Sequence, residues 1–371
     1  MVEASNKLTS KGNLRSKSTT NKIILEKRVD EVYRYWSKQS FPYYETSNKY
    51  RNEQFDKFLR TNDQSSLDFS NRILKFNNSG LSLCWSYFKH AFEVRCNNLN
   101  SPIDVFNSER LFKNGIRKVL TGTFFTKKSV SELCNQTPQA KQSIYTILRR
   151  ITGTQMVSNF RPVTASMIYK IFCDSGDVVW DMSSGWGGRL LGSIKSKINY
   201  IGTDPSSKTI KGNKELAKQF GNKNYSYTLH QCGSEEFEPD RNSLDFAFTS
   251  PPYFDREQYS DDEEQSFKAY PKYDDWRDNF LKPTLTNAYE SLRNDRYLLW
   301  NIADIKIGKD KYHPLEQDSI DVIEALGGEY QGKLKMLMTS MVGVDQSNVK
   351  NSVKVNGTYL KYEPIFIFYK K

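Results

Sequence analysis

From about Met156 onward, short apolar runs alternate with segments of helical periodicity, and this rhythm constrains the fold more than any other feature. The apolar runs predict strands at 177–182, 200–204, 225–231, 244–249, 297–305, 334–339 and 364–369. Predicted helices at 188–194 and 206–220 separate the first three strands. Strands that alternate with helices of this length form a doubly wound, mainly parallel α/β sheet, which is the predicted fold class. Ligands of such sheets bind beyond the carboxyl ends of the strands.

Charge is distributed unevenly along the 371 residues. Residues 1–150 hold 26 Lys and Arg against 13 Asp and Glu, whereas residues 151–371 hold 28 against 30. The formal net charge of +11 therefore comes from the first part of the chain. A basic module joined to a near-neutral one favours a protein that binds a polyanion, the plainer alternative being a soluble protein with a basic tail.

The first part of the chain also differs in periodicity. Residues 1–22 combine scattered lysines with Ser, Thr and Asn, which predicts a flexible basic arm. From there to about residue 150, apolar residues recur three and four positions apart, which indicates helices. We therefore expect a mostly helical domain over 23–155, followed by the α/β domain over 156–371.

The motifs that the sequence lacks argue against several classes of protein. No run approaches ~18 apolar residues and the polar start resembles no secretory signal, so neither a membrane span nor export is expected. Five scattered cysteines fit a reducing cytoplasm better than a disulfide framework. No metal site is expected, because the three histidines are far apart and no Cys-x-x-Cys occurs. No Gly-x-Ser-x-Gly elbow of a serine hydrolase is present.

Two features of the first two strands indicate a ligand site. Residues 181–188, after the first strand, read DMSSGWGG, and such glycines let the backbone approach a ligand beside the free N–H groups of a helix. Their spacing matches neither the dinucleotide fingerprint nor a P-loop. Asp204 ends the second strand 23 residues after Asp181, where a carboxylate can hold the two ribose hydroxyls of an adenosine.

The most specific motif reads TSPPY over residues 249–253, at the end of the fourth strand. Its two prolines remove two N–H donors and stiffen the backbone. Ser250 Oγ and the Pro251 carbonyl can accept the two hydrogens of an exocyclic amino group, while Tyr253 stacks on a planar base. The alternative, a proline-stiffened turn beside a core tyrosine, is disfavoured by the position of the motif and by its neighbours.

Residues from about 156 to 371 resemble the S-adenosylmethionine-dependent amino methyltransferases of DNA, which methylate cytosine N4 or adenine N6. The TSPPY segment resembles the catalytic tetrapeptide of that family with its preceding threonine, and DMSSGWGG resembles its cofactor loop. The resemblance implies a Rossmann-like methyltransferase fold and S-adenosyl-L-methionine as cofactor. The catalytic residues that it implies are Ser250, Pro251, Pro252 and Tyr253.

The resemblance also implies a set of cofactor-binding residues. Phe160, Arg161 and Pro162 match the segment that covers the methionine end of the cofactor, Asp181 lies near its amino group, and Asp204 holds the ribose. The remaining members of the set are Ser183, Gly185, Gly187, Ser234 and Thr249. The sequence departs from the family pattern after the third strand, where residues 231–234 read QCGS and lack the usual acid. Ser234 or backbone groups are therefore expected at the adenine.

These matches imply methyl transfer to the N4 amine of a cytosine flipped out of duplex DNA, by direct displacement without a covalent enzyme intermediate. A serine at position 250 is typical of N4-cytosine enzymes. The alternatives are adenine N6 with the same residues, an RNA or small-molecule amine, and an inactive nucleic-acid-binding protein of this fold. C5-cytosine methylation is excluded because no Pro-Cys nucleophile is present. A companion restriction endonuclease is a candidate partner.

DNA recognition is expected mainly from the first part of the chain, because the α/β segment leaves room for little more than an aromatic loop at 254–273. Residues 129–151 have the spacing of a helix-turn-helix with a Gln-Thr-Pro turn. The second helix would present the candidate DNA-binding residues Gln139, Lys141, Gln142 and Arg149. Two ordinary packed helices would give the same pattern.

Overall fold

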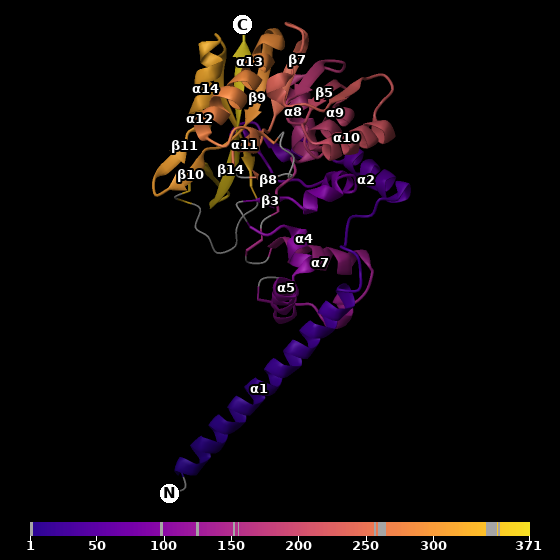
Figure 1. The fold of residues 1–371 in the computed structure, drawn as a ribbon, viewed down its shortest axis with the longest axis vertical. Helices are drawn as coiled ribbons and strands as arrows, with labels where there is room; N and C mark the ends of the chain where they lie inside the picture. The colour runs from indigo at the N-terminus through magenta and orange to yellow at the C-terminus, as the bar shows by residue number, and fades with distance from the viewer. Residues whose placement is uncertain are drawn as a thin grey trace. The chain divides into compact units, whose positions relative to one another are not determined.

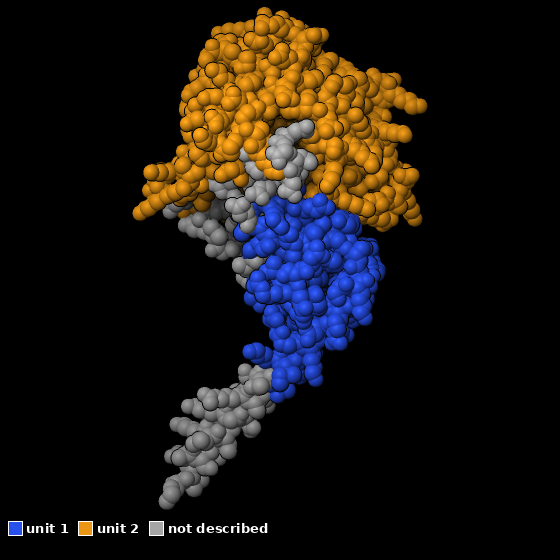
Figure 2. All heavy atoms as spheres, viewed as in Figure 1, with its two compact units in different colours: residues 1–43, 92–157 blue, residues 44–91, 158–371 orange. Residues whose placement is uncertain are grey.

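The computed structural model describes residues 3–371 apart from 97–98, 124–125, 151–152, 155, 256, 259–264, 339–346 and 348, with backbone alone for 3–19, 150, 257, 258 and 267. The chain forms two compact units (Figure 2). Unit 1 consists of residues 1–43 and 92–157, and unit 2 of residues 44–91 and 158–371. The described residues include no helix with the length and apolar composition of a membrane span.

Unit 1 is mostly helical (Figure 1). Its elements are α1 (Glu3–Trp36), β3 (Arg95–Cys96), α4 (Pro102–Asn107), α5 (Glu109–Thr121), α6 (Val130–Leu133) and α7 (Pro138–Arg150). Val29, Val32 and Trp36 of α1 are fully buried, and the Trp36 indole donates to the Leu133 carbonyl at 2.8 Å. The segment predicted as a flexible arm, 1–22, is helical from Glu3 as part of α1, since it contains no proline and a single glycine.

Unit 2 is built on a ten-stranded sheet in the order β1-β2-β12-β14-β9-β7-β4-β5-β6, with β13 paired to β14. The strands are β1 (Leu67–Asp68), β2 (Ile73–Leu74), β4 (Val178–Asp181), β5 (Asn199–Thr203), β6 (Tyr227–His230), β7 (Leu244–Thr249), β9 (Leu292–Asn301), β12 (Glu329–Leu337), β13 (Ser352–Val355) and β14 (Thr358–Lys370). Neighbours from β6 through β9 are parallel, whereas β14 runs antiparallel to β9 and β12. The predicted doubly wound, mainly parallel α/β class is confirmed.

The strand order reverses direction between β4 and β7. From β4 the chain moves outward to β5 and β6, and it then returns to place β7 and β9 on the other side of β4. In sheets of this class, ligands bind outside the carboxyl ends of the two strands at such a reversal, which here are β4 and β7. The predicted glycine loop and the TSPPY segment follow these two strands.

Helices cover the sheet, and alternate strand residues enter two hydrophobic clusters (Figure 1). Trp180 and Leu298 belong to one cluster, whereas their strand neighbours Val179 and Leu299 belong to the other. The longer helices are α2 (Asn48–Arg60), α8 (Pro162–Phe172), α9 (Gly188–Ser196), α10 (Ser207–Phe220), α13 (Lys282–Ser291) and α14 (Leu315–Ala325). Shorter helical segments are Gln64–Ser66, α3 (Leu81–Trp85), Lys89–Phe92, Ser234–Glu236, α11 (Ser266–Ala269), α12 (Tyr273–Trp276) and the π-helix Arg277–Leu281.

The structure divides the chain differently from the predicted boundary at 155, because residues 44–91 belong to unit 2. Strand β2 joins the sheet beside β12. Asp63, only 2% exposed, accepts hydrogen bonds from Lys170 Nζ and Lys195 Nζ, both at 2.6 Å, and from Ser166 at 2.8 Å. These partners are more than 100 residues away, so no local sequence pattern indicates them.

Three predicted strands differ in extent from the observed ones by five or six residues at their start, because β9, β12 and β14 begin at Leu292, Glu329 and Thr358. The predicted strand 297–305 is divided, because β9 ends at Asn301 and Ile305 begins a separate hairpin of β10 (Ile305–Gly308) and β11 (Lys311–His313). Strand β12 begins at Glu329, five residues before the predicted start, because its polar first residues pair with β14 at Tyr369 and Phe368. Residue 339, the predicted end, lies outside the described residues.

Candidate active site

Four strand ends of the sheet bring the predicted site residues to one edge. Asp181 is the last residue of β4, Asp204 follows β5, and Ser250 follows β7. Ser234 lies four residues beyond β6. Since these strands are parallel, their carboxyl ends face the same side of unit 2.

Asp181 lies at the centre of a buried hydrogen-bond network. Its Oδ2 accepts from Arg189 Nε at 2.8 Å and from the Tyr200 hydroxyl at 2.6 Å, and its Oδ1 accepts from Thr249 Oγ1 at 2.8 Å. Burial, together with the Asp181 carboxylate, raises the pKa of Tyr200, so this hydroxyl stays a donor. The structure thus directs Asp181 to partners within the protein. Arg189 and Tyr200 were not among the predicted site residues.

Thr249 ties the glycine loop to the end of β7. Its hydroxyl donates to Asp181 and accepts from the Ser183 amide at 3.0 Å. The Ser183 carbonyl in turn accepts from Arg189 Nη2. Since Thr249 is fully buried, this connection holds the end of β4 against the residue that precedes Ser250.

The glycine loop needs its glycines for two different reasons. Gly185 and Gly187 have φ values of +52° and +73°, in the left-handed region that favours glycine. At Gly188 a Cβ atom would lie 2.0 Å from the Phe160 carbonyl oxygen, so the chain before α8 crosses the loop in direct contact. Asn159 secures that crossing, because its Nδ2 donates to the Trp186 carbonyl at 2.8 Å.

Phe160 and Arg161, the two residues before α8, contact different parts of unit 2. The Phe160 ring packs against Phe248 at 5.3 Å, beside the glycine loop. Arg161 is 6% exposed and turns to the end of β12, where its Nη2 donates to the Leu337 carbonyl and its guanidinium lies 4.7 Å from the Phe76 ring centroid. Burial lowers the pKa of Arg161 to about 10. Pro162 is the first residue of α8.

Asp204 keeps acceptor capacity at the tip of β5. Its Oδ2 accepts from the Gly185 amide at 3.1 Å and its Oδ1 from the Ser206 amide at 3.0 Å. Burial raises its pKa to about 6, although these two amides act in the opposite direction. Each carboxylate oxygen can accept a second hydrogen bond, so the group can receive a pair of hydroxyl donors.

The segment after β6 contains an acid that the sequence analysis missed. The Ser234 hydroxyl is buried and lies 2.9 Å from Thr284 Oγ1 on α13, so its partner is within the protein. The next residue, Glu235, is partly buried, and no described residue donates to its Oε2. Burial raises the pKa of Glu235. A buried carboxylate oxygen without a donor is a suitable place for an N–H group of a ligand.

The TSPPY turn is held by an aromatic cluster. Ser250 is partly exposed, whereas Pro251 is buried. Phe254, directly after the motif, has a φ of +37°, which is strained for a bulky residue. Its ring is 5% exposed and packs against Tyr273, Trp276 and His313 at centroid distances of 5.5–5.8 Å. This packing fixes the backbone that carries Ser250.

In unit 1 the predicted helix-turn-helix consists of α6, a turn and α7. Gln139 and Gln142 are exposed and share one face of α7 with the partly exposed Arg149, because they are spaced three and seven positions apart. Lys141 lies two positions after Gln139, which turns it to the opposite side of the helix, where it is partly buried. Helix α7 contains no acidic residue, so its exposed face carries hydrogen-bonding groups and positive charge.

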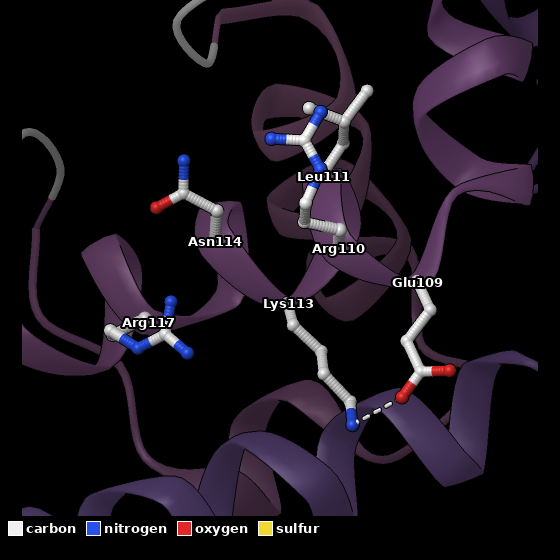
Figure 3. A pocket seen from close by; sticks show the side chains of 6 residues that line it. All are labelled: Glu109, Arg110, Leu111, Lys113, Asn114 and Arg117. Atoms are coloured by element: carbon white, nitrogen blue, oxygen red, sulfur yellow. Dashed lines mark ion pairs between the residues drawn. The ribbon is translucent and has the colours of Figure 1, made fainter.

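Two surface pockets lie in unit 1. The first, of about 570 Å³, is lined by α5 and contains three cations, Arg110, Lys113 and Arg117 (Figure 3). Two of them are paired, Lys113 with Asp30 and Glu109, and Arg117 with Glu26. We assign no ligand to this pocket. The second, of about 520 Å³, adjoins α6 and is lined by Leu25, Arg28, Leu120, Lys127, Lys128, Ser129, Val130 and Ser131. Across the described residues, no group of three or more His, Cys, Asp or Glu could hold a metal ion.

No protein-family model and no curated protein sequence matches this chain. Part of the chain is similar to the crystal structure of TrmN from Thermus thermophilus, at 12% identity and a TM-score of 0.37 over 57% of this chain and 49% of that one. It is also similar to magnesium protoporphyrin IX methyltransferase from Synechocystis PCC 6803 with bound SAM, at 11% identity and a TM-score of 0.34 over 53% of this chain and 71% of that one. The crystal structure of a putative rRNA methylase from Clostridium thermocellum is similar at 12% identity and a TM-score of 0.33, over 58% of this chain and 98% of that one. Similarities of this size carry no activity over to this chain.

Proposed function

We propose that this protein is an S-adenosylmethionine-dependent methyltransferase that modifies the exocyclic N4 amine of cytosine in duplex DNA. One observation carries the proposal: the TSPPY turn and the glycine loop meet at one edge of the sheet, where Thr249 bonds to both Asp181 and Ser183. The resemblance of both segments to DNA amino methyltransferases supplies the reaction class.

The residues at this edge fit the proposed cofactor. Asp204 has acceptor capacity for the two ribose hydroxyls, and its raised pKa reflects a partly buried carboxylate with few donors. Glu235 Oε2, which receives no bond from the described residues, can accept from the adenine amino group. The crossing of Phe160 over Gly188 closes the loop from the side of α8. The cofactor, when bound, supplies an electrophilic methyl group.

The TSPPY turn supplies the groups that act on the amine. An aromatic amine is a poor nucleophile, because its lone pair is delocalised into the ring. Ser250 Oγ and the Pro251 carbonyl oxygen each accept a hydrogen bond from one N–H of the amino group. These two hydrogen bonds favour a pyramidal nitrogen with an exposed lone pair. The rate then depends on positioning and on electrostatic stabilisation, with no covalent enzyme intermediate. Tyr253 provides an aromatic surface for the base.

Charge supports a nucleic acid as substrate. Unit 1 contains 19 Lys and Arg against 8 Asp and Glu, whereas unit 2 contains 35 of each, so the net charge of +11 lies in unit 1. The pocket beside α6 includes Arg28 and Lys127, which have no acidic partner among the described residues. The acid-free face of α7 adds hydrogen-bonding groups that can contact base edges. These features favour DNA with both phosphate and base contacts.

Identification of the methylated nucleoside tests the proposal. The protein is incubated with S-adenosylmethionine and unmethylated genomic DNA, the DNA is digested to nucleosides, and the products are identified by mass spectrometry, with the Ser250→Ala variant as control. N4-methylcytosine that depends on Ser250 is expected. N6-methyladenine alone would overturn the assignment of the base, and the absence of both would overturn the assignment as a DNA amino methyltransferase. A parallel incubation with RNA tests the RNA alternative.

A further inference from the structure

A short hairpin of unit 2 lies outside the set of residues to which the proposed reaction assigns a role. Strands β10 (Ile305–Gly308) and β11 (Lys311–His313) pair antiparallel and project from the rest of the unit (Figures 1 and 2). All residues from 306 to 312 are exposed. The hairpin follows β9, whose carboxyl end lies beside that of β7.

The base of the hairpin is fixed against the TSPPY turn. The His313 ring stacks on Tyr273 at a centroid distance of 4.1 Å and meets the edge of Phe254 at 5.5 Å. Ile305, opposite His313 in the ladder, is 4% exposed within the same hydrophobic cluster. Because Phe254 directly follows Tyr253, the hairpin is anchored one residue from the proposed base-binding turn.

The tip of the hairpin combines an exposed apolar side chain with positive charge. The pairing register shifts between Lys306 and Gly308, so Ile307 is the extra residue of a β-bulge, and its exposed fraction is 55%. A bulge can turn a side chain away from the ladder. Lys309 lies in the turn and Lys311 directly follows it, and among the described residues neither pairs with a carboxylate. Asp310 is the single acid between residues 306 and 312.

We propose that this hairpin inserts into duplex DNA beside the target base: Lys309 and Lys311 contact phosphates, and Ile307 enters the base stack at the position that the flipped base leaves. The inference rests on the proposed function for its substrate. Apolar side chains of DNA-binding proteins can occupy a disrupted base step, and the contact offsets part of the cost of unstacking. The bulge, the exposed isoleucine and the lysine pair supply the two kinds of contact that this insertion requires.

The salt dependence of DNA binding tests the lysine contacts. The probe is a fluorescein-labelled 30-bp duplex, and anisotropy gives its affinity for the full chain at several KCl concentrations. Lys309→Ala/Lys311→Ala should reduce the slope of log K against log[salt] by about 1 to 2, since each phosphate contact contributes about 0.9. Lys218→Ala/Lys223→Ala removes the same charge at two exposed positions around the end of α10 and should leave the slope unchanged. Equal slopes for the two double variants would refute the contacts.

A duplex with a single abasic site tests Ile307, because its stack already contains a gap. The affinity of the wild-type chain for this duplex should be at least about fivefold higher than for the intact one, since no base must be unstacked. Ile307→Ala should lose that preference, whereas Ile171→Ala, which truncates another exposed isoleucine, should keep it. Retention of the preference by Ile307→Ala, or its absence in the wild type, would overturn the insertion.

Failure of the insertion can be distinguished from failure of the proposed function. Both binding assays work without S-adenosylmethionine and without methyl transfer. If N4-methylcytosine forms but the abasic preference does not depend on Ile307, the methyltransferase assignment stands and the insertion is wrong. If the abasic preference depends on Ile307 but no methylated base forms, the chain inserts into DNA and the reaction assignment is wrong.

Discussion

Replacement of Asp204 by Asn tests whether this carboxylate holds the ribose of the cofactor. Burial raises its pKa to about 6, while the amides of Gly185 and Ser206 each donate to one oxygen. Hydroxyl donors stabilise the ionised carboxylate, so binding of the cofactor favours loss of the proton. Affinity should therefore be highest above pH 6 and should decrease as the free carboxylate becomes protonated.

The magnitude follows from the pKa. At about pH 5, one unit below a pKa of about 6, roughly one molecule in eleven carries the ionised carboxylate, which weakens binding about tenfold or by about 1.4 kcal/mol. The side-chain amide of the Asp204→Asn variant has no charge to lose. That variant should bind about 10- to 100-fold more weakly at pH 7.5, the loss of a charged hydrogen-bond partner, and its affinity should not change between pH 5 and pH 7.5.

The effect of Asp204 on folding has the opposite sign. A carboxyl group whose pKa is raised by folding contributes stability below its unfolded pKa of about 4, and that contribution is lost as the pH rises through about 6. Asp204→Asn should therefore not lower the melting temperature at pH 7.5. Weakened binding by this variant would then reflect the lost contact and not a lost fold.

Titration calorimetry with S-adenosylmethionine between pH 5 and pH 8 measures these effects. Asp240→Asn, which makes the same chemical change at an exposed position, is the matched control and should behave as the wild type. Two results would show that Asp204 does not hold the ribose. One is that Asp204→Asn binds the cofactor as tightly as the wild type, and the other is that its affinity still changes tenfold with pH.

Three further substitutions test the remaining parts of the structure. Ser250→Ala should lower the rate constant of methyl transfer about 10- to 1000-fold in single-turnover experiments, because the hydroxyl acts on the amine as charge develops. The cofactor Kd should change little. Tyr253→Ala should weaken DNA binding by about 1–3 kcal/mol in anisotropy titrations, the contribution of one aromatic stack, and an unchanged affinity would remove the stack. Asp63→Ala should lower the free energy of unfolding in urea by about 3–5 kcal/mol, because it leaves Lys195, whose side chain is 7% exposed, without its carboxylate. Asp240→Ala is the control for Asp63→Ala and should change that free energy by less than about 0.5 kcal/mol.

The division into units changes how the DNA-binding part should be separated from the rest. Deletion of residues 1–155 would remove Asp63 and strand β2 from unit 2 together with the basic unit. A loss of DNA binding in such a fragment would therefore not distinguish missing contacts from a damaged sheet. Substitution of Arg28 and Lys127, both exposed in unit 1, reduces its charge and leaves unit 2 intact.

Local sequence patterns were sufficient to predict the central strands and the motifs at their ends. Predicted strand 244–249 coincides with β7, and the runs at 177–182 and 200–204 contain β4 and all but one residue of β5. A buried parallel strand is a continuous apolar run, and a turn at its end needs Gly or Pro, so both signals lie within a few adjacent residues. The order of these motifs was sufficient to predict one edge of the sheet as the site.

The residues that hold that edge together could not be predicted from local sequence, because they come from distant segments of the chain. Asp181 is bonded by residues 8, 19 and 68 positions away, and Asp63 by residues more than 100 positions away. The free oxygen of Glu235 and the bulge at Ile307 likewise depend on how neighbouring elements pack. Local periodicity reports which face of an element is apolar, but burial of a charge and the choice of its partner are set when distant segments meet.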